Sequence, residues 1–136
     1  MFESLFKTAN YLQKGLDATS LRHQVITNNI ANAETPDFKS SSVEFETIFQ
    51  NALNGDNFVN KITRDKHRAF SPAADVDEIH PVVILNETTE MRMDGNNVDP
   101  DFQQAELAKN QILQNAYVEK LNGEYRRLGM AIREGR

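Results

Sequence analysis

Few residues in this sequence have the type and spacing that metal binding or catalysis requires. His23 has no second histidine or carboxylate one helical turn away, and His67 and His80 stand singly in a polar stretch. A histidine of this kind is more often a partly buried packing residue than a ligand. The acidic segment 75–78 could hold a cation, but a solvated acidic loop is the more ordinary interpretation. We therefore predict no metal site from these residues.

Segment 94–99 (Asp-Gly-Asn-Asn-Val-Asp) begins like a calcium-binding loop and then departs from it. Asp99 stands where such a loop needs glycine, and the twelfth position is not glutamate. Cysteine is absent, which excludes disulfides, thiolate metal sites and cysteine nucleophiles. The sequence also lacks a phosphate-binding glycine loop and a nucleophile elbow. These observations predict a protein that is not an enzyme and that has no cofactor and no small-molecule substrate.

The charge pattern favours protein partners. The 136 residues carry 15 basic and 20 acidic side chains, which gives a formal net charge of −5. The one basic cluster, at 61–68, is interrupted by Asp65 and has no interleaved aromatic residues, so we predict no nucleic-acid interface. The triplet Asn86-Glu87-Thr88 matches a glycosylation sequon, a pattern short enough to arise by chance.

The elements expected to position any functional residue are two long helices, one at each end of the chain. Apolar or small residues recur in a three-four rhythm over the first third of the sequence, at Phe2, Leu5, Ala9, Leu12, Leu16, Thr19, His23, Ile26, Ile30 and Ala33. The same rhythm returns at Val118, Leu121, Tyr125, Leu128 and Ile132. A stripe this narrow is typical of a helix that packs against another helix. We predict a mainly α-helical fold in which helices at about 3–33 and 100–134 pair like a coiled coil.

The ends of both helices have recognisable signals. Pro36 is expected to end the first helix, and Asp99-Pro100 supplies an N-cap and a proline at the first helical position of the second. Gly15 is a flaw inside the first helix, worth about 1 kcal/mol relative to alanine. The terminal segments 1–36 and 99–136 are predicted to form one structural domain, with 37–98 as a central segment between them.

The central segment is predicted to contain little regular structure. Ser42 is placed to cap a short helix that buries Phe45 and Phe49 and ends at Gly55. Residues 55–81 have no consistent period and are expected to form a long, mobile loop. The β-branched run 82–85 and the alternation around Met91 and Met93 favour two short strands or an extended segment.

Two motifs at the inner ends of the predicted helices resemble a known family. The first is asparagine-rich and leads into a Thr-Pro turn; it consists of Asn28, Asn29, Ile30, Asn32, Thr35, Pro36 and Phe38. The second precedes the C-terminal helix and includes Asp94, Gly95, Asn96 and Val98. Together they resemble the axial proteins of the bacterial flagellum, which are the rod, hook and hook-associated subunits, and within these the proximal rod proteins. Asp37 stands where the family usually has glycine, so we expect aspartate to adopt a positive φ there.

The resemblance implies a structural subunit of the proximal rod of the flagellar basal body. Its implied partners are copies of itself, other proximal rod proteins, and the MS ring and export gate proteins at the rod base. The first residues carry an acid where a secretory signal would carry positive charge, so export is expected to use the flagellar type III system without a cleaved signal.

Several alternatives stay open at this stage. The motif asparagines either cap and loosen a helix end or pack between subunits, and the family resemblance favours the second. A sibling axial protein would share both helices and the Thr-Pro turn. A small helical adaptor that binds one partner through a helix in a groove would instead form a complex of fixed stoichiometry.

Overall fold

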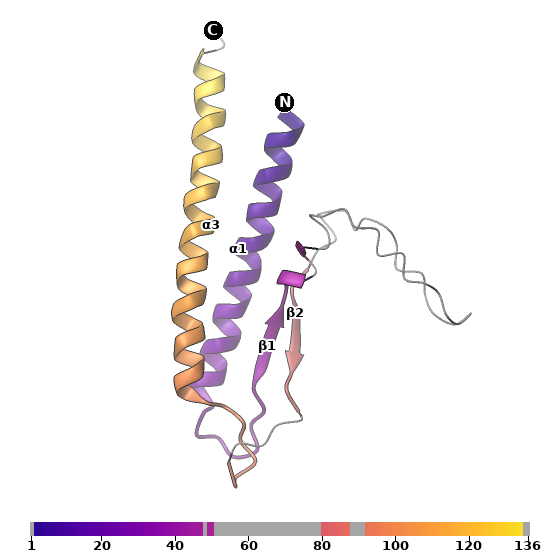
Figure 1. Ribbon diagram of the computed structural model, residues 1–136, viewed down its shortest axis with the longest axis vertical. Coiled ribbons are helices and arrows are strands. Elements are labelled where there is room, and N and C mark those ends of the chain that lie inside the picture. Colours follow the sequence, from indigo (N-terminus) through magenta and orange to yellow (C-terminus); the bar gives the residue numbers. More distant parts are fainter. Residues whose placement is uncertain (1, 48, 51–79, 88–91, 135–136) are drawn as a thin grey trace, which may run out of the picture.

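Two long antiparallel helices and a two-stranded ribbon make up the fold. The computed structural model describes residues 2–47, 49–50, 80–87 and 92–134. The regular elements run in the order α1 (Phe2–Ala31), β1 (Ser41–Glu44), β2 (Val82–Leu85) and α3 (Pro100–Glu134). The N-terminal end of α1 and the C-terminal end of α3 lie at the same end of the molecule, and the ribbon lies beside the other half of α1 (Figure 1). The predicted mainly helical fold is confirmed.

Both helices begin and end close to the predicted residues. The first ends within two residues of the expectation, in the turns that lead to Pro36. The second begins at Pro100, because the Asp99 carboxylate oxygen Oδ1 accepts hydrogen bonds from the amides of Asp101 (3.0 Å) and Phe102 (3.2 Å). This is the N-cap arrangement that the sequence predicts.

Small side chains allow the two helices to approach closely. Thr19 of α1 is buried, and on α3 the buried Asn110 donates from Nδ2 to the backbone oxygen of Thr19 (2.9 Å). The buried Ala18 packs against Phe45, which follows β1. Gly15, which the sequence presents as a flaw, lies under the ring of Tyr117: a Cβ at Gly15 would lie 2.6 Å from two of the ring carbons. Because Gly15 has no side chain, the Tyr117 ring can lie directly against the backbone of α1.

The seam on α3 differs from the predicted one. Leu121 and Leu128 are half-buried as expected, but Val118, Tyr125 and Ile132 are 40%, 56% and 67% exposed. The side of α3 that contacts α1 is rotated about the helix axis from the predicted side and includes polar residues such as Asn110. A pattern of apolar residues does not detect such positions. These three side chains are more exposed than Leu121 and Leu128, so they lie at the edge of the contact between the two helices or outside it.

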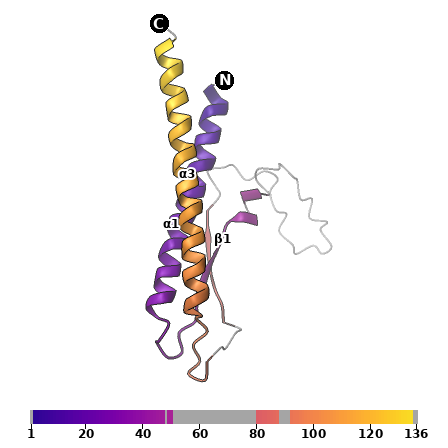
Figure 2. The ribbon, with the colours of Figure 1, turned by 60° about the vertical axis from the view of Figure 1, so that its left-hand side comes forward.

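The ribbon covers one side of α1. Strands β1 and β2 are antiparallel, with Val43 opposite Val83 and Ser41 opposite Leu85. Val43 is buried, whereas all four residues of β2 are exposed because β2 lies on the far side of β1 from the helices (Figure 1). The four aliphatic side chains of β2 thus form an apolar surface that no described segment covers. Figure 2 shows the two long helices side by side from another direction.

The predicted middle of the chain needs correction at two points. Ser42 lies within strand β1 and does not cap a helix; the helical turn follows it, with the Phe49 amide donating to the Phe45 backbone oxygen (2.9 Å). Phe45 stacks on Phe49 with ring centroids 5.0 Å apart, and Tyr11 of α1 meets Phe49 edge-on. Met93 lies in a turn, not in an extended segment, and the predicted loop 55–81 falls mostly outside the described residues.

Candidate functional site: the asparagine junction and the groove beside it

Three asparagines tie together the chain segments that meet at the inner ends of the two helices. We call Asn29, Asn96 and Asn97, with their hydrogen-bond partners, the asparagine junction. All three are buried, and Asn96 is 0% exposed. Buried amides of this kind are tolerated only when their donors and acceptors are satisfied, so their bonds specify one arrangement of the backbone.

Asn96 holds the turn that ends α1. Its Nδ2 group donates to the backbone oxygens of Asn32 (3.0 Å), Ala33 (3.0 Å) and Thr35 (2.8 Å). Its Oδ1 accepts from the amide of Val98 (2.7 Å). A single side chain thus satisfies carbonyls that the end of α1 leaves without helical partners and fixes the chain entering α3.

Asn29 and Asn97 extend the junction to the ribbon and to α3. The Asn29 side chain donates to the Ser41 oxygen (2.7 Å) and to Gln103 Oε1 (3.2 Å), and accepts from the Ser41 amide (3.0 Å). Asn97 accepts from the Ser40 amide (2.6 Å) and donates to the Asn86 oxygen (2.7 Å). Each described helix and strand therefore contains a residue bonded to the junction or is directly next to one.

Two residues with positive φ bring the two motifs into contact. Asp37 has φ 58° and Gly95 has φ 77°, and the Asp37 amide donates to the Asp94 oxygen (2.9 Å). The expected left-handed conformation at Asp37 is confirmed. A Cβ at Gly95 would lie 2.5 Å from Asp37 Oδ1, so glycine is needed there for space as well as for its dihedral angle.

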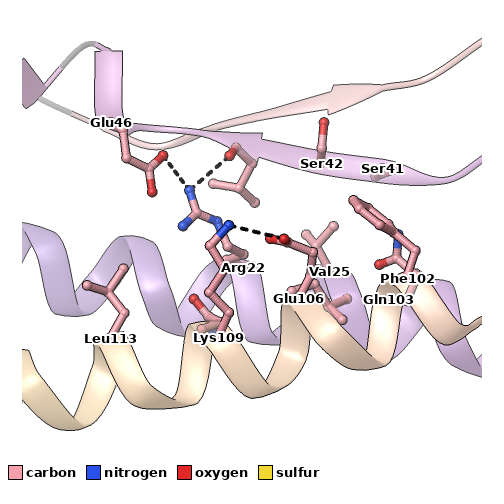
Figure 3. Close-up of a pocket in the computed structure, with 13 residues that line it drawn as sticks. Arg22, Val25, Ser41, Ser42, Glu46, Phe102, Gln103, Glu106, Lys109 and Leu113 are labelled. Carbon is pink, nitrogen blue, oxygen red and sulfur yellow. Dashed lines mark hydrogen bonds and ion pairs between the residues drawn. The ribbon is translucent and has the colours of Figure 1, made fainter.

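A groove opens beside the junction, between β1 and α3, with α1 as its floor (Figure 3). We call it the α3/β1 groove. Its volume is about 360 Å³, and its apolar lining includes Val25, Ile26, Val43, Phe102 and Leu113. Gln103 and Asn110 also line it, so the groove is continuous with the polar contacts between the helices.

The charged groups of the groove are paired with one another. Arg22 donates from Nη2 to Glu46 Oε2 (2.6 Å) and to the Val43 oxygen (3.2 Å), which links α1 to the end of β1. The hydrogen bond from Arg22 lowers the pKa of the Glu46 carboxyl below its ordinary value. On α3, Lys109 and Glu106 form an ion pair of 3.2 Å. The four charged side chains that line the groove therefore form two ion pairs and together carry no net charge.

Among the described residues there is no group of three histidine, cysteine, aspartate or glutamate side chains that could hold a metal ion. His23 is half-buried, as expected of a packing residue. Within the same part of the chain, no helix has the length and apolar character needed to cross a membrane.

Comparison with known proteins gives a consistent result. A family model described as "Flagella basal body rod protein" matches residues 10–39, which include the asparagine-rich motif. The flagellar basal body rod protein FlgB of Bacillus subtilis is 35% identical over 98% of this chain and 99% of its own length. The chain belongs to the FlgB family of flagellar basal body rod proteins. FlgB of Borreliella burgdorferi is 36% identical over 79% of this chain and 82% of its own length, and that of Proteus mirabilis is 24% identical over 99% and 100%.

The predicted family resemblance is therefore confirmed, and the structure shows where its motif residues lie in this FlgB-family chain. Asn29, Asn96 and Val98 are buried at the junction, while Asn28, Thr35 and Pro36 are exposed. The side chain of the buried Asn29 bonds to Ser41 and Gln103, which gives this asparagine a structural role within the chain. Asn32 donates to the oxygen (2.8 Å) and to Oδ1 (3.0 Å) of Asn28, which closes the last turn of the helix.

The remaining predicted residues lie along α1, except Phe38, which lies between α1 and β1. Ala9 and Ile26 are buried, and Leu12, Leu16, Ile30 and Phe38 are half-buried. Leu5 lies in α1, and its side chain falls outside the described set.

Sequence reasoning missed several junction residues. The asparagines bond to the backbone of Ser40 and Ser41 and to the side-chain Oε1 of Gln103. Nothing in these three residue types indicates this role. Asn97 is the exception, because it lies inside the recognised 94–99 motif. Its position two residues after the turn at Gly95 is the signal that could have identified it.

Proposed function

We propose that this chain is a structural subunit of the proximal rod of the flagellar basal body. The observation that carries the proposal is the 35% identity to a FlgB rod protein over 98% of the chain. Its partners in this proposal are copies of itself, other proximal rod proteins, and the MS ring and export gate proteins at the rod base. The subunits together enclose the export channel and transmit torque from the motor.

The fold suits a subunit that completes its packing through neighbours. Two helices and a ribbon form a thin layer, and large apolar side chains on α3 and β2 stay exposed. Contacts between different surfaces of identical subunits propagate when they do not close into a ring, and such contacts build tubes. The exposed members of the predicted assembly set are the best placed to make them: Asn28, Thr35, Pro36, Val118, Tyr125 and Ile132.

The asparagine junction would supply stiffness for torque transmission. A buried, satisfied hydrogen-bond network resists rearrangement because breaking one bond leaves a buried polar group unpaired. The junction joins both helices and the ribbon at one end, so a load applied to either helix reaches the other through short hydrogen bonds.

Export and assembly would be coupled through the other end of the helix pair. In this proposal the chain passes the flagellar type III apparatus unfolded, without a cleaved signal, and the outer halves of α1 and α3 become ordered on contact with the rod. Hydrogen exchange on the free chain is expected to show fast exchange at about 2–16 and 118–134 and slow exchange near the junction. Equal protection along both helices would contradict the coupling.

A cryo-EM reconstruction of basal bodies from the source organism tests the proposal as a whole. We expect density at the base of the rod for two antiparallel helices with the β1–β2 ribbon beside them. Density for a sibling rod protein at every such position would refute it. A separate soluble complex with one partner at fixed stoichiometry would support the adaptor alternative.

A further inference from the structure

Two buried polar atoms near the contact between α1 and α3 have no hydrogen-bond partner among the described residues. They are Nδ1 of His23 and Oδ1 of Asn110. Asn110 is 2% exposed as a whole, and the half-buried His23 has its Nδ1 atom enclosed. Most buried polar atoms in folded proteins bond to another protein group or to an ordered water molecule, because an unpaired one is costly. The two atoms therefore mark a place where a further partner is needed.

Both atoms belong to side chains that lie around one backbone carbonyl, that of Thr19. Asn110 donates from Nδ2 to the Thr19 oxygen (2.9 Å), which holds the whole amide group beside that oxygen. His23 follows Thr19 by four residues in α1, so in the α-helical pattern its backbone amide bonds to the same oxygen. Residues four apart also project from the same face of a helix. We call Thr19, His23 and Asn110 the Thr19 cluster.

The chemistry of the two atoms favours a small bridging molecule over a direct bond. An amide oxygen only accepts hydrogen bonds, whereas Nδ1 of a neutral imidazole donates in one tautomer and accepts in the other. A direct bond would need one particular tautomer, and the two atoms do not form such a bond in the structure. A water molecule between them fits either tautomer, because it donates to the oxygen and either donates to or accepts from the nitrogen.

We propose that the Thr19 cluster binds one ordered water molecule that bridges Asn110 Oδ1 and His23 Nδ1. Buried waters typically make about three hydrogen bonds. Thr19 can supply the third, because its buried hydroxyl donates to the Leu16 oxygen (2.9 Å) and still has lone pairs to accept another hydrogen. A metal cation fits this cluster less well than water, because none of its three side chains is a carboxylate.

The α3/β1 groove gives this water molecule a route from solvent. Asn110 lines the groove together with Ile26 and Leu113, and it contacts the Thr19 oxygen of α1 as well. The bound water would bond to groups of both helices between two other contacts, the Tyr117 ring over Gly15 and the bond from Asn29 to Gln103. It would therefore help to fix the rotation of α3 against α1 along a part of the contact where the asparagine junction does not reach.

NMR of the full-length chain in solution tests the site. The experiment measures cross-relaxation between water and the side-chain amide hydrogens of Asn110, in both the laboratory and the rotating frame, which separates bound water from hydrogen exchange. We expect Asn110 to show the sign of a long-lived water molecule. Asn115, an exposed asparagine on the same helix, is the internal control and should show only the sign of mobile surface water.

Two substitutions of His23 then test the bridge itself. His23→Leu removes the Nδ1 atom and should abolish the long-lived water signal at Asn110. His23→Asn is the matched control, because an asparagine amide carries a nitrogen or oxygen on Cγ, where histidine carries Nδ1, and it should retain the signal. A histidine that only fills space would not produce this difference between the two variants. Circular dichroism at the helix band checks that each variant is folded.

The unmodified chain decides the main question, whether or not the variants fold. Absence of a long-lived water signal at Asn110 in the unmodified chain would overturn the proposal. A signal that stays unchanged in folded His23→Leu would also overturn it, because the water would then not bridge His23. Neither result bears on the proposed rod function, which rests on the similarity to FlgB rod proteins.

Discussion

Replacing Asn96 by alanine should be one of the most damaging single changes at the junction. The side chain is 0% exposed and bonds to the backbone oxygens of Asn32, Ala33 and Thr35 and to the amide of Val98. Its amide group has two hydrogens, so the three donated contacts count as about two bonds. With the bond accepted from Val98, the side chain makes about three bonds.

The expected loss follows from which groups remain unpaired. Asn32 and Ala33 keep partners, because the Thr35 amide also donates to the Asn32 oxygen (3.0 Å) and Arg92 Nη1 to the Ala33 oxygen (3.2 Å). The Val98 amide is buried and loses its acceptor, which costs about 1–3 kcal/mol, and each remaining bond contributes about 1 kcal/mol net. We expect Asn96→Ala to lower the free energy of unfolding by about 3 kcal/mol.

Urea unfolding of the free chain, followed by circular dichroism at the helix band, measures this difference. Asn28→Ala is the matched control, because Asn28 is exposed and the bond that its Oδ1 accepts from Asn32 (3.0 Å) is exposed too, so the free energy of unfolding should change by less than about 1 kcal/mol. Asn96→Asp should destabilise at least as much as Asn96→Ala at neutral pH, since a carboxylate would face carbonyl oxygens without a hydrogen to donate. If Asn96→Ala and Asn28→Ala unfold at the same urea concentration, the junction does not stabilise the fold.

Three further substitutions test other features of the fold. Gly15→Ala places a Cβ 2.6 Å from the Tyr117 ring and should destabilise the chain by about 1–2 kcal/mol. In a Tyr117→Ala background it should stabilise by about 1 kcal/mol through helix propensity, and urea unfolding that showed no change of sign would refute the contact. Asp37→Val should cost about 1–3 kcal/mol in thermal unfolding, because a β-branched residue resists φ 58°, whereas Asp37→Gly should be tolerated. Glu46→Gln should cost less than about 1 kcal/mol at pH 7, because the ion pair with Arg22 is partly exposed. Since Arg22 lowers the folded pKa of Glu46, this contribution is present above the ordinary value of 4.5 and is lost as pH falls through the folded value; a difference that persisted in acid would point to another cause.

The long helices could be predicted because their signals are local. Pro36 and Asp99-Pro100 act on the backbone within one turn, and the N-cap bonds of Asp99 are those that the sequence indicates. The positive φ at Asp37 was expected from the family resemblance, because the family usually has glycine at this position and aspartate tolerates that conformation better than most residues.

Strand β1 could not be predicted in the same way. Its sequence, Ser-Ser-Val-Glu, contains one apolar residue, and its pairing partner β2 lies about 40 residues further along the chain. The bonds from Asn29 to Ser41 and from Asn97 to Ser40 also help to hold it extended. Such pairing depends on contacts that are distant in sequence, which a pattern read over a few residues does not include.

The orientation of α3 was predicted only in part, for a related reason. An apolar rhythm selects Val118, Tyr125 and Ile132, but the contact with α1 is fixed by Asn110 and by the fit of Tyr117 over Gly15. Polar and small residues set the rotation of the helix, so the apolar stripe faces outward. A pattern of apolar residues predicts a surface that must be covered; it does not say whether the cover comes from the same chain.

The distribution of apolar side chains explains why this fold suits a rod. Of the seven buried apolar residues among those that the structure describes, three are alanines: Ala9, Ala18 and Ala33. Burial of so few large side chains contributes little hydrophobic free energy, and most large aliphatic residues of α3 and β2 remain in contact with water. The free chain must therefore rely on the asparagine junction to select one arrangement of its helices, because hydrogen bonds specify geometry where apolar packing is scarce. Association between copies would add the hydrophobic free energy that the single chain lacks, so the stability of the helix pair and growth of the rod would depend on the same contacts.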